Sequence, residues 1–346
     1  KFLLLHHANL KLKNSNKTLV QYAVAGGNCE IIRICQQNLL DFDNTSYIAA
    51  FFHQKPVFDW IHSIQNNDLE QKSVEYGTVL HQAVSGYNVS QIYDLIKYEG
   101  IDPNILDFNQ RTPLHFAVLC NMTNSIKLLL SIDSVNPNLQ DKDGNTPFML
   151  AVKNSKKEVI QAFIDCNKVN INLKHNNSIS PLHLLAKNDH FHSLPMLLRS
   201  TQLDLNQLDN KGRTPFYKAV MKNNMQAVQD LCSIKGIEIN APDNNGMSPL
   251  HVAVQNGNLN LISTILNTNG IDVNAQDNNK LTPLHIAVSQ TFNDQNIVTR
   301  YRVVSKLLKR KGIDLSLRNQ EGQTAAELAR QNQLMDIASL IMNYNA

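Results

Sequence analysis

The feature that most constrains this chain is a unit that returns at a constant interval along most of its length. Each unit opens on a Ser or Thr anchor, followed in most units by Pro and then Leu or Phe. The anchors stand at positions 78, 112, 146, 180, 214, 248 and 282, so the interval between them is always 34. A strict period of this length indicates a solenoid, in which each unit packs on its neighbours and no single central core is needed. Positions within a unit are counted below from its anchor.

The unit that begins at Ser248 predicts two helices. Pro249 is tolerated in the first turn of a helix, and the hydroxyl of the residue before it is placed to cap that helix. Apolar residues then follow at helical spacing, at 250, 253 and 254, and Gly257 ends the helix. A second helix carries apolar residues at 259, 262, 265 and 266. The polar stretch 271–280 is rich in Asn and Asp and predicts an extended turn or hairpin.

This pattern resembles the ankyrin repeat. The unit reads Thr-Pro-Leu-His-x-Ala, a short turn, a Leu-Leu pair, then Gly-Ile-Asp-x-Asn and Asp-x-x-Gly. The resemblance covers essentially the whole chain. It implies an all-α solenoid of stacked helix-turn-helix units joined by hairpins or turns. The repeat length is 34 where the family more commonly has 33, and the extra residue precedes Gly-Ile-Asp.

The resemblance divides the chain into four parts. We expect residues 1–17 to be the end of a preceding, truncated repeat, with 2–5 as the end of a helix and 8–17 as a connecting turn. Residues 18–77 are two divergent units, which resemble the long ankyrin arrays of protists; secreted bacterial ankyrin effectors are the alternative. Regular repeats fill 78–323, with an insertion at 292–303, and 324–346 form a C-terminal capping repeat. Pro195 predicts a kink within the second helix of its unit.

Composition excludes several classes of protein. The formal net charge is only +3, which gives no general case for nucleic-acid binding. No apolar run approaches the 18 or so residues that a membrane span needs. The five cysteines are odd in number and lack Cys-x-x-Cys spacing, which favours a reducing, cytoplasmic location. We expect a monomer with no metal and no cofactor.

Rows of polar residues recur at the same positions of successive units, as the ligands of a metal array or the groups of a catalytic site would. Five histidines stand three residues after their anchors: His81, His115, His183, His251 and His285. Stacked units place them roughly 10 Å apart, too far to share an ion. We therefore expect each imidazole to bond neighbouring turn backbone, as in other ankyrin proteins. The equally regular Asp and Asn rows predict turn building. No phosphate loop or nucleophile elbow occurs, and we identify no catalytic residue.

The informative positions are those that the fold leaves free. By resemblance, ankyrin proteins bind partners through the hairpin tips and the exposed side of the first helix, at positions −4, −3, −1, +7 and +8. In the three units anchored at 146, 180 and 214, six of these fifteen residues are basic and one is acidic, against 32 basic residues in all 346. We call the predicted partner-binding surface the basic strip: Lys142, Lys153, Ile179, Lys187, Lys211, Arg213, Met221 and Lys222. Its apolar anchoring requires Met221, Ile179 and Phe148 to be accessible. A solvated surface with chance clustering of charge is the alternative.

A second basic group surrounds the insertion. This secondary basic patch comprises Arg300, Arg302, Lys306, Lys309, Arg310 and Lys311. It is either the solvated side of a lengthened second helix or a site for an acidic partner or an anionic membrane surface.

These observations predict a non-catalytic scaffold or adaptor that binds a protein or peptide partner, an acidic one if the basic strip is the site. We expect no nucleic-acid partner and no membrane span. The rival interpretation is a targeting or regulatory ankyrin segment of a larger enzyme, secreted effector or channel.

Overall fold

The structure is a computed structural model of the chain. It describes residues 13–14, 17–37, 40, 42, 45–52, 54–65, 72–73, 77–86, 89–97, 101–154, 157–187, 194–200, 202–289, 292 and 296–344. Contacts divide the chain into two compact units, Lys1–Asn170 and Ile171–Ala346, which are called the N-terminal and C-terminal halves. Each half is described by itself.

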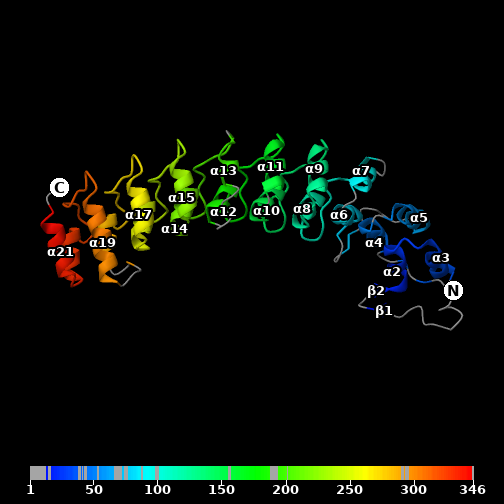
Figure 1. Cartoon of the computed structure of the whole chain (residues 1–346), viewed down its shortest axis with the longest axis horizontal. Helices are drawn as coiled ribbons and strands as arrows, with labels where there is room; N and C mark the ends of the chain where they lie inside the picture. The colour runs from blue at the N-terminus through cyan, green and yellow to red at the C-terminus, as the bar shows by residue number, and fades with distance from the viewer. Residues whose placement is uncertain are drawn as a thin grey trace. The chain divides into compact units, whose positions relative to one another are not determined.

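The N-terminal half is a succession of helix pairs preceded by a short ribbon (Figure 1). Its elements are β1 Lys13–Asn14, β2 Lys17–Thr18, α2 Leu19–Ala25, α3 Cys29–Gln37, α4 Thr45–Phe51, α5 Lys55–Gln65, α6 Val79–Ser85, α7 Val89–Lys97, α8 Pro113–Leu119, α9 Thr123–Ser131, α10 Pro147–Asn154 and α11 Lys157–Asp165. The two strands are antiparallel, with Lys13 opposite Thr18. The sequence predicts a connecting turn at 8–17, and the described residues of this region form a short antiparallel ribbon.

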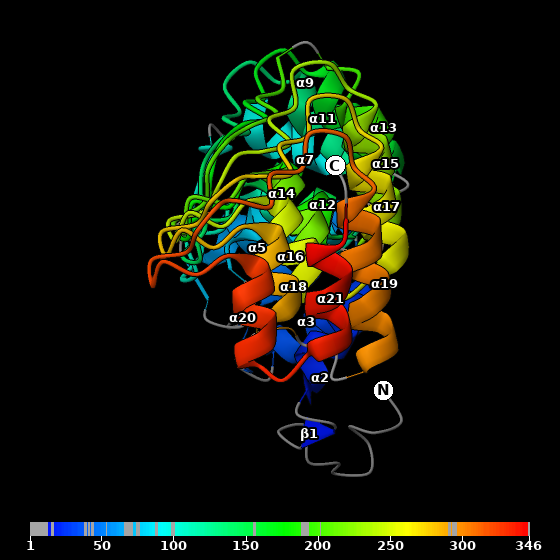
Figure 2. The ribbon, with the colours of Figure 1, turned by 90° about the vertical axis from the view of Figure 1, so that its left-hand side faces the viewer.

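The C-terminal half continues the same alternation of first and second helices. Its elements are α12 Pro181–Lys187, α13 Leu194–Leu197, α14 Pro215–Met221, α15 Met225–Cys232, α16 Pro249–Gln255, α17 Leu259–Leu266, α18 Pro283–Val288, α19 Ile297–Leu308, α20 Ala325–Gln331 and α21 Met335–Met342. Seen along the stack, α16, α18 and α20 form one row and α17, α19 and α21 a second, while the connecting loops project to one side (Figure 2).

Each first helix begins at its anchor for the predicted reason. The Ser248 hydroxyl accepts the backbone N–H of His251, and Pro249 occupies the first turn, where its missing N–H removes no helix bond. The apolar residues Leu250, Ala253 and Val254 are fully buried. Gly257 follows the helix with a φ of 69°, a left-handed conformation that favours glycine.

The core lies between the two rows of helices and between successive pairs. In the C-terminal half, α16 packs on α14, α17 and α18, and α17 packs on α15 and α19. Leu250, Ile262 and Ile265 are all completely buried by these contacts. No pair could bury its apolar faces alone, so stability depends on the neighbours. The predicted all-α solenoid is confirmed.

Two local predictions have different outcomes. Pro195 is the second residue of the four-residue α13 and lies in its first turn. The residues before it, 188–193, lie outside the described ranges, so the kink within this helix stays a prediction. The lengthened second helix after the insertion is present, because α19 has 12 residues where α17 has 8. The helix end expected at 2–5 and the turn expected at 293–294 lie outside the described residues.

Candidate protein-binding surface

Aspartates at position −5 build the hairpin tips that carry much of the basic strip. In the tip before Ser248, the Asp243 carboxylate accepts the backbone N–H groups of Asn245 and Met247 at 2.9 and 3.1 Å. Asp107, Asp141, Asp209 and Asp277 make the same pair of bonds in their tips. The turn-building role predicted for this row is therefore confirmed.

Backbone bonds join successive tips and hold them in register. In the C-terminal half, the Asn244 N–H donates to the Lys211 carbonyl at 3.0 Å, and the Asn278 N–H donates to Asn245 at 3.0 Å. In the N-terminal half, the Lys142 N–H donates to Asn109 at 2.9 Å. Equal positions are thus held side by side in these pairs of neighbouring units, which are anchored at 112 and 146, 214 and 248, and 248 and 282.

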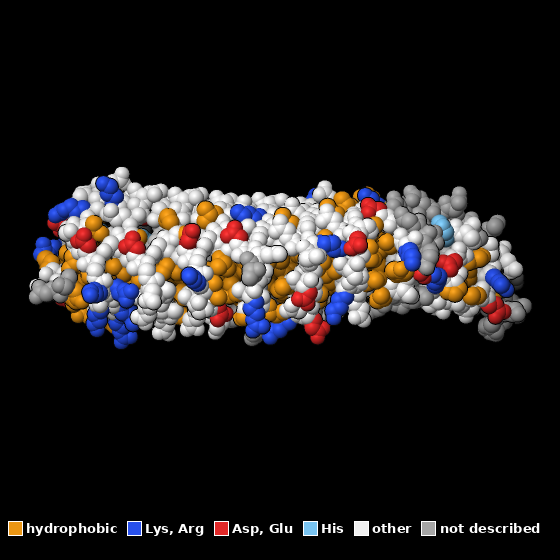
Figure 3. Space-filling view, turned by 90° about the horizontal axis from the view of Figure 1, so that it is seen from above, with side chains coloured by type: hydrophobic (Ala, Val, Ile, Leu, Met, Phe, Trp, Pro, Cys, Tyr) orange, Lys and Arg blue, Asp and Glu red, His pale blue; other side chains and the backbone are white. Residues whose placement is uncertain are grey.

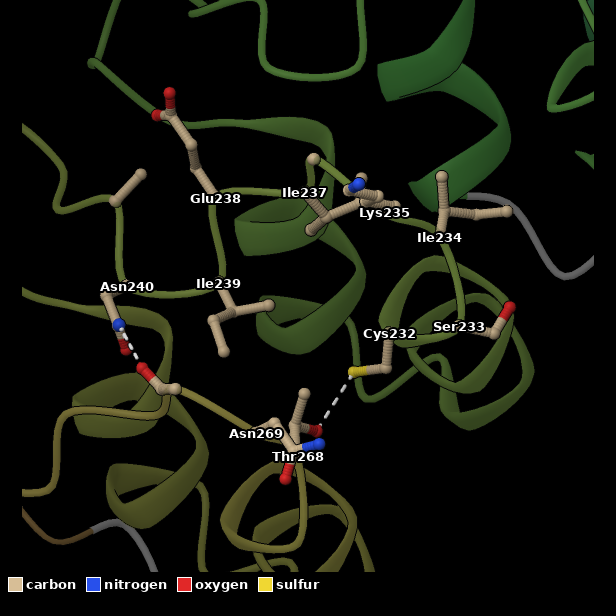
Figure 4. A pocket seen from close by; sticks show the side chains of 13 residues that line it. Cys232, Ser233, Ile234, Lys235, Ile237, Glu238, Ile239, Asn240, Thr268 and Asn269 are labelled. Atoms are coloured by element: carbon tan, nitrogen blue, oxygen red, sulfur yellow. Dashed lines mark hydrogen bonds between the residues drawn. The ribbon is translucent and has the colours of Figure 1, made fainter.

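Asparagines form a second ladder on the turn after each second helix. The Asn240 amide donates to the Gly270 carbonyl at 2.7 Å and accepts the Asp272 N–H at 2.9 Å. Asn104, Asn138, Asn172, Asn206 and Asn274 repeat this donor bond. Figure 4 shows the Asn240 bond beside a hollow of about 750 Å³, which Cys232 and Thr268 help to line. No residue of the basic strip lines this hollow.

The five anchor histidines are structural. Each Nδ1 accepts the backbone N–H of its anchor at 3.0–3.3 Å, and each Nε2 donates to a carbonyl of the following unit at 2.8–3.0 Å. Because an N–H only donates and a carbonyl only accepts, these bonds fix the neutral tautomer that carries its proton on Nε2. The prediction that they bond turn backbone is confirmed. Burial lowers the pKa of every one of them, and brings that of His81 and His183 to about 4.

Other features bear on alternative activities. Across the described ranges, no group of three or more His, Cys, Asp or Glu side chains is placed to hold a metal ion. None of the helices in the part of the chain that the structure describes is long and apolar enough to cross a membrane. The residues 190–192, which include two further histidines, lie outside the described ranges.

Two lysines of the basic strip belong to the N-terminal half. Lys142 is exposed at a tip, and Lys153 is exposed in the last turn of α10, where its ammonium donates to the Asn145 side chain at 2.6 Å. Positions −1 and +7 of this unit are therefore adjacent in space. Phe148 is only 1% exposed, because it lies in the core against Phe163. It cannot supply the apolar anchoring predicted for it, because it is not accessible.

The other residues of the strip lie in the C-terminal half. Lys187, Lys211 and Lys222 are exposed, whereas Ile179 and Met221 are half-buried. Arg213 is not a free cation, since its guanidinium forms an ion pair with Asp209 at 3.0 Å and also contacts the Met221 sulfur at 3.4 Å. The freely available charge of this half of the strip thus comes from its three lysines.

The secondary basic patch is smaller than predicted. Arg300 is only 7% exposed, because its guanidinium donates to the Ser289 carbonyl at 2.8 Å and stacks over Phe292 at 4.8 Å. It is therefore a packing residue. The half-buried Lys306 donates to the Ser263 hydroxyl at 2.6 Å. The half-buried Arg310 and the exposed Arg302, Lys309 and Lys311 complete the group. Figure 3 shows Lys and Arg side chains gathered near the C-terminal end.

The unit anchored at Thr214 contains a buried charged cluster that none of the sequence patterns above predicts. Lys218 lies at position +4, and its ammonium contacts the Asp209 carboxylate at 3.0 Å. Burial raises the pKa of Asp209, but bonds from Arg213 and Lys218 outweigh it and hold that pKa well below its ordinary value. Burial lowers the pKa of Lys218, and the charge of Lys187 adds to this effect. The signal was in the sequence: a lysine stands where neighbouring units have Leu184 and Val252.

Tyr217 links this cluster to the next unit. It replaces the histidine at position +3, and its hydroxyl donates to Asp243 at 3.0 Å. Burial and the adjacent carboxylate of Asp243 raise the pKa of Tyr217 well above its ordinary value. The aromatic hydroxyl thus preserves a cross-unit bond at a position where most units use imidazole.

The fold and these ladders define a helical repeat protein in which capped helix pairs are joined through histidine, asparagine and backbone bonds. A sequence model of the family described as ankyrin repeats (3 copies) matches residues 46–141, 132–209, 149–243, 196–277 and 234–300. These matches together span 46–300, so the chain belongs to the ankyrin-repeat family. Ankyrin repeats are generally protein–protein interaction modules. A search of curated proteins found no match.

Proposed function

We propose that this chain is a non-catalytic scaffold or adaptor whose partner is a protein with acidic side chains. The family supports a protein partner. The observation that carries the proposal is the arrangement of Lys187, Lys211 and Lys222, which are exposed at positions +7, −3 and +8 of two neighbouring units. Because the histidine, aspartate and asparagine rows are occupied in holding the fold together, the family's role in binding is better supported than catalysis.

The lysines are expected to act mainly on the rate of association. Each exposed pair contributes only about 0–1 kcal/mol, and salt screens it. Several like charges on one surface accelerate encounter with an oppositely charged partner. Met221 and Ile179 are half-buried and offer limited apolar contact area beside them.

The test replaces Lys187, Lys211 and Lys222 together by Glu and follows the capture of partners from lysate, with salt varied. A matched control replaces Lys127, Lys157 and Lys235 together by Glu, so that the net charge changes equally. These three lysines are exposed on second helices or on the turn after one. Partners lost from the first variant and kept by the control would support the basic strip. If the first variant keeps every wild-type partner at low and moderate salt, the strip is not the site.

The secondary basic patch is the second candidate surface. On α19, Ile297 and Val298 are each 52% exposed and Tyr301 is 43% exposed, close in sequence to the exposed Arg302. Reversal of Arg302, Lys309 and Lys311 to Glu tests this surface separately.

We also propose a reducing compartment, such as the cytosol, as the location. All five cysteines are free thiols, and Cys35 is fully buried. The role of this chain as a targeting or regulatory segment of a larger enzyme, effector or channel remains the alternative, and the sequence of the complete reading frame decides it.

A further inference from the structure

Two large apolar side chains of the unit anchored at Thr112 are exposed to solvent. Phe108, at position −4 in the hairpin tip, is 57% exposed, and Leu119, at position +7 in the last turn of α8, is 41% exposed. Phe116 lies three residues before Leu119 on the same helix, is half-buried, and carries the guanidinium of Arg111 over its ring at 5.0 Å. Apolar side chains that gather on an exposed face mark interaction surfaces.

The next unit, anchored at Thr146, has lysine at the same two positions. Lys142 stands at −4 and Lys153 at +7, and both are exposed. In the preceding unit, anchored at Thr78, position +7 holds the buried Ser85. The surface of the N-terminal half therefore changes from apolar to cationic between the units anchored at 112 and 146.

A chain of bonds places the Lys153 ammonium beside α8. The helices α8 and α10 pack on each other and lie side by side in Figure 1. His115 of α8 donates from Nε2 to the Asn145 carbonyl at 3.0 Å, and the Asn145 side chain accepts from the Lys153 ammonium at 2.6 Å. The Asn154 amide also donates to the Val118 carbonyl at 3.5 Å. These bonds hold position +7 of one unit next to position +7 of the other.

The charges on the tips and first helices of these two units cancel in total. The negative groups are Asp107, Asp141 and Asp143, and the positive groups are Arg111, Lys142 and Lys153. Asp107 is paired with Arg111, and Asp141 accepts backbone N–H groups within its tip. At the tip, Asp143 directly follows Lys142, whereas Lys153 is the charged residue of α10. The surface therefore suits one carboxylate at Lys153 rather than a run of acidic residues.

The distance between the units sets the spacing that a ligand needs. Packed helices are separated by roughly 8–10 Å, and an extended chain advances about 3.3 Å per residue. A step from one unit to the next therefore corresponds to about three residues of an extended segment.

We propose that Phe116, Leu119 and Lys153 bind an extended segment of the protein partner that carries an apolar side chain and a carboxylate three residues apart. The apolar side chain packs on Leu119 and Phe116, with Phe108 at the tip of the same unit, and the carboxylate pairs with the Lys153 ammonium. The apolar contact supplies affinity and the ion pair fixes the register. This inference rests on the proposed function, because it takes the partner to be a protein.

The experiment selects random 12-residue peptides, displayed on phage, for binding to the whole chain at moderate salt. We expect the wild type to enrich peptides in which an apolar residue and an Asp or Glu are three positions apart. Lys153→Glu is expected to keep the apolar residue and to select Lys or Arg in place of the acid. A gain of this new preference requires a folded protein, so loss of folding cannot imitate it.

A matched control and a second variant measure the two contacts separately. Lys127→Glu changes the net charge equally on the exposed side of α9, and we expect it to enrich the wild-type pattern. Leu119→Ser alters an exposed residue, so it is expected to fold and to lose the apolar preference. For one synthetic peptide of the wild-type pattern, the Kd should rise about tenfold with Leu119→Ser or Lys153→Glu and less than about twofold with Lys127→Glu.

The outcomes separate this inference from the function on which it rests. If the reversal of Lys187, Lys211 and Lys222 abolishes selection while Lys153→Glu and Leu119→Ser leave the pattern unchanged, the proposed function stands and this inference is overturned. Selection that depends on Leu119 and Lys153 but not on those three lysines supports this inference and removes them from the site. If the wild type enriches no peptide, both are overturned. An enriched pattern with no acid, or with a spacing other than three, overturns the register.

Discussion

Each anchor histidine bonds both its own helix start and the next unit through one side chain. His251 caps its own helix through Nδ1 and bonds the Leu281 carbonyl of the next unit through Nε2. The carbonyl partner lies 30 residues ahead in four of the five cases, and 38 ahead for His285. The additional eight residues equal the excess of the 42-residue interval from Thr282 to Thr324 over the usual 34. The bond is therefore specified by position in the stack and tolerates a change in loop length.

We predict that the C-terminal half loses stability as the pH falls from about 6.5 to about 4. The pKa of His183 is about 4 in the folded chain against 6.5 ordinarily. The unfolded chain therefore binds more protons in this interval, and stability present above pH 6.5 is lost as the pH falls. His183 contributes roughly 3 kcal/mol to this loss. Thermal unfolding of this half, monitored by hydrogen exchange at a series of pH values, measures this loss of stability.

The control for this prediction is His183→Met, because Met149 holds the same position in the preceding unit. This variant is expected to be less stable than wild type near pH 7 and to lose less stability on acidification. An equal loss in both proteins would show that His183 does not titrate as its buried position implies.

The helix α19 shows how an insertion is accommodated within one element. Its buried Arg300 bonds the Ser289 carbonyl just after α18 and stacks on Phe292 in the connecting segment. The side chain therefore ties the start of the lengthened helix to the end of the preceding one. A residue that the sequence places in a basic patch serves packing, because its long stem is buried and its planar head stacks on Phe292.

We predict that Arg300→Ala lowers the free energy of unfolding by roughly 2 kcal/mol or more, since it removes a charge-assisted bond to a buried carbonyl and a cation–π contact. Arg302→Ala is the matched control, because it lies two residues away on the same helix and is exposed. Its expected effect is within about 0.5 kcal/mol. Chemical denaturation of both variants gives the comparison, and equal effects would contradict the packing role.

At the scale of the whole molecule, stability is the sum of units and their neighbour contacts. We predict that Leu250→Ala removes roughly 2–5 kcal/mol locally, because the side chain is completely buried between α16 and its neighbours. Amide protection should fall across the C-terminal half, and denaturation should resolve into more than one transition. Residues 101–154 should keep their protection. A single two-state transition, with protection lost uniformly, would contradict independent unfolding of the two halves.

The sequence by itself determined the architecture. The constant interval between anchors, Ser/Thr-Pro at each helix start and helical spacing of apolar residues are local signals, and they act through capping, ring geometry and burial of one face. The roles of the histidine, aspartate and asparagine rows followed from their regular phase. These features repeat, so each unit reinforces the interpretation of the next.

Only the tertiary structure decided which charges are available to a partner. In the sequence, Arg213, Arg300 and Lys187 are equal cations. In the structure, Arg213 is paired with Asp209, Arg300 is buried against Phe292 and Lys187 is exposed. The sequence also hides the buried ion pair of Lys218, because the contact with Asp209 joins the first helix to the tip that precedes it. Pairing and burial depend on distances between separate elements, and no local pattern specifies them.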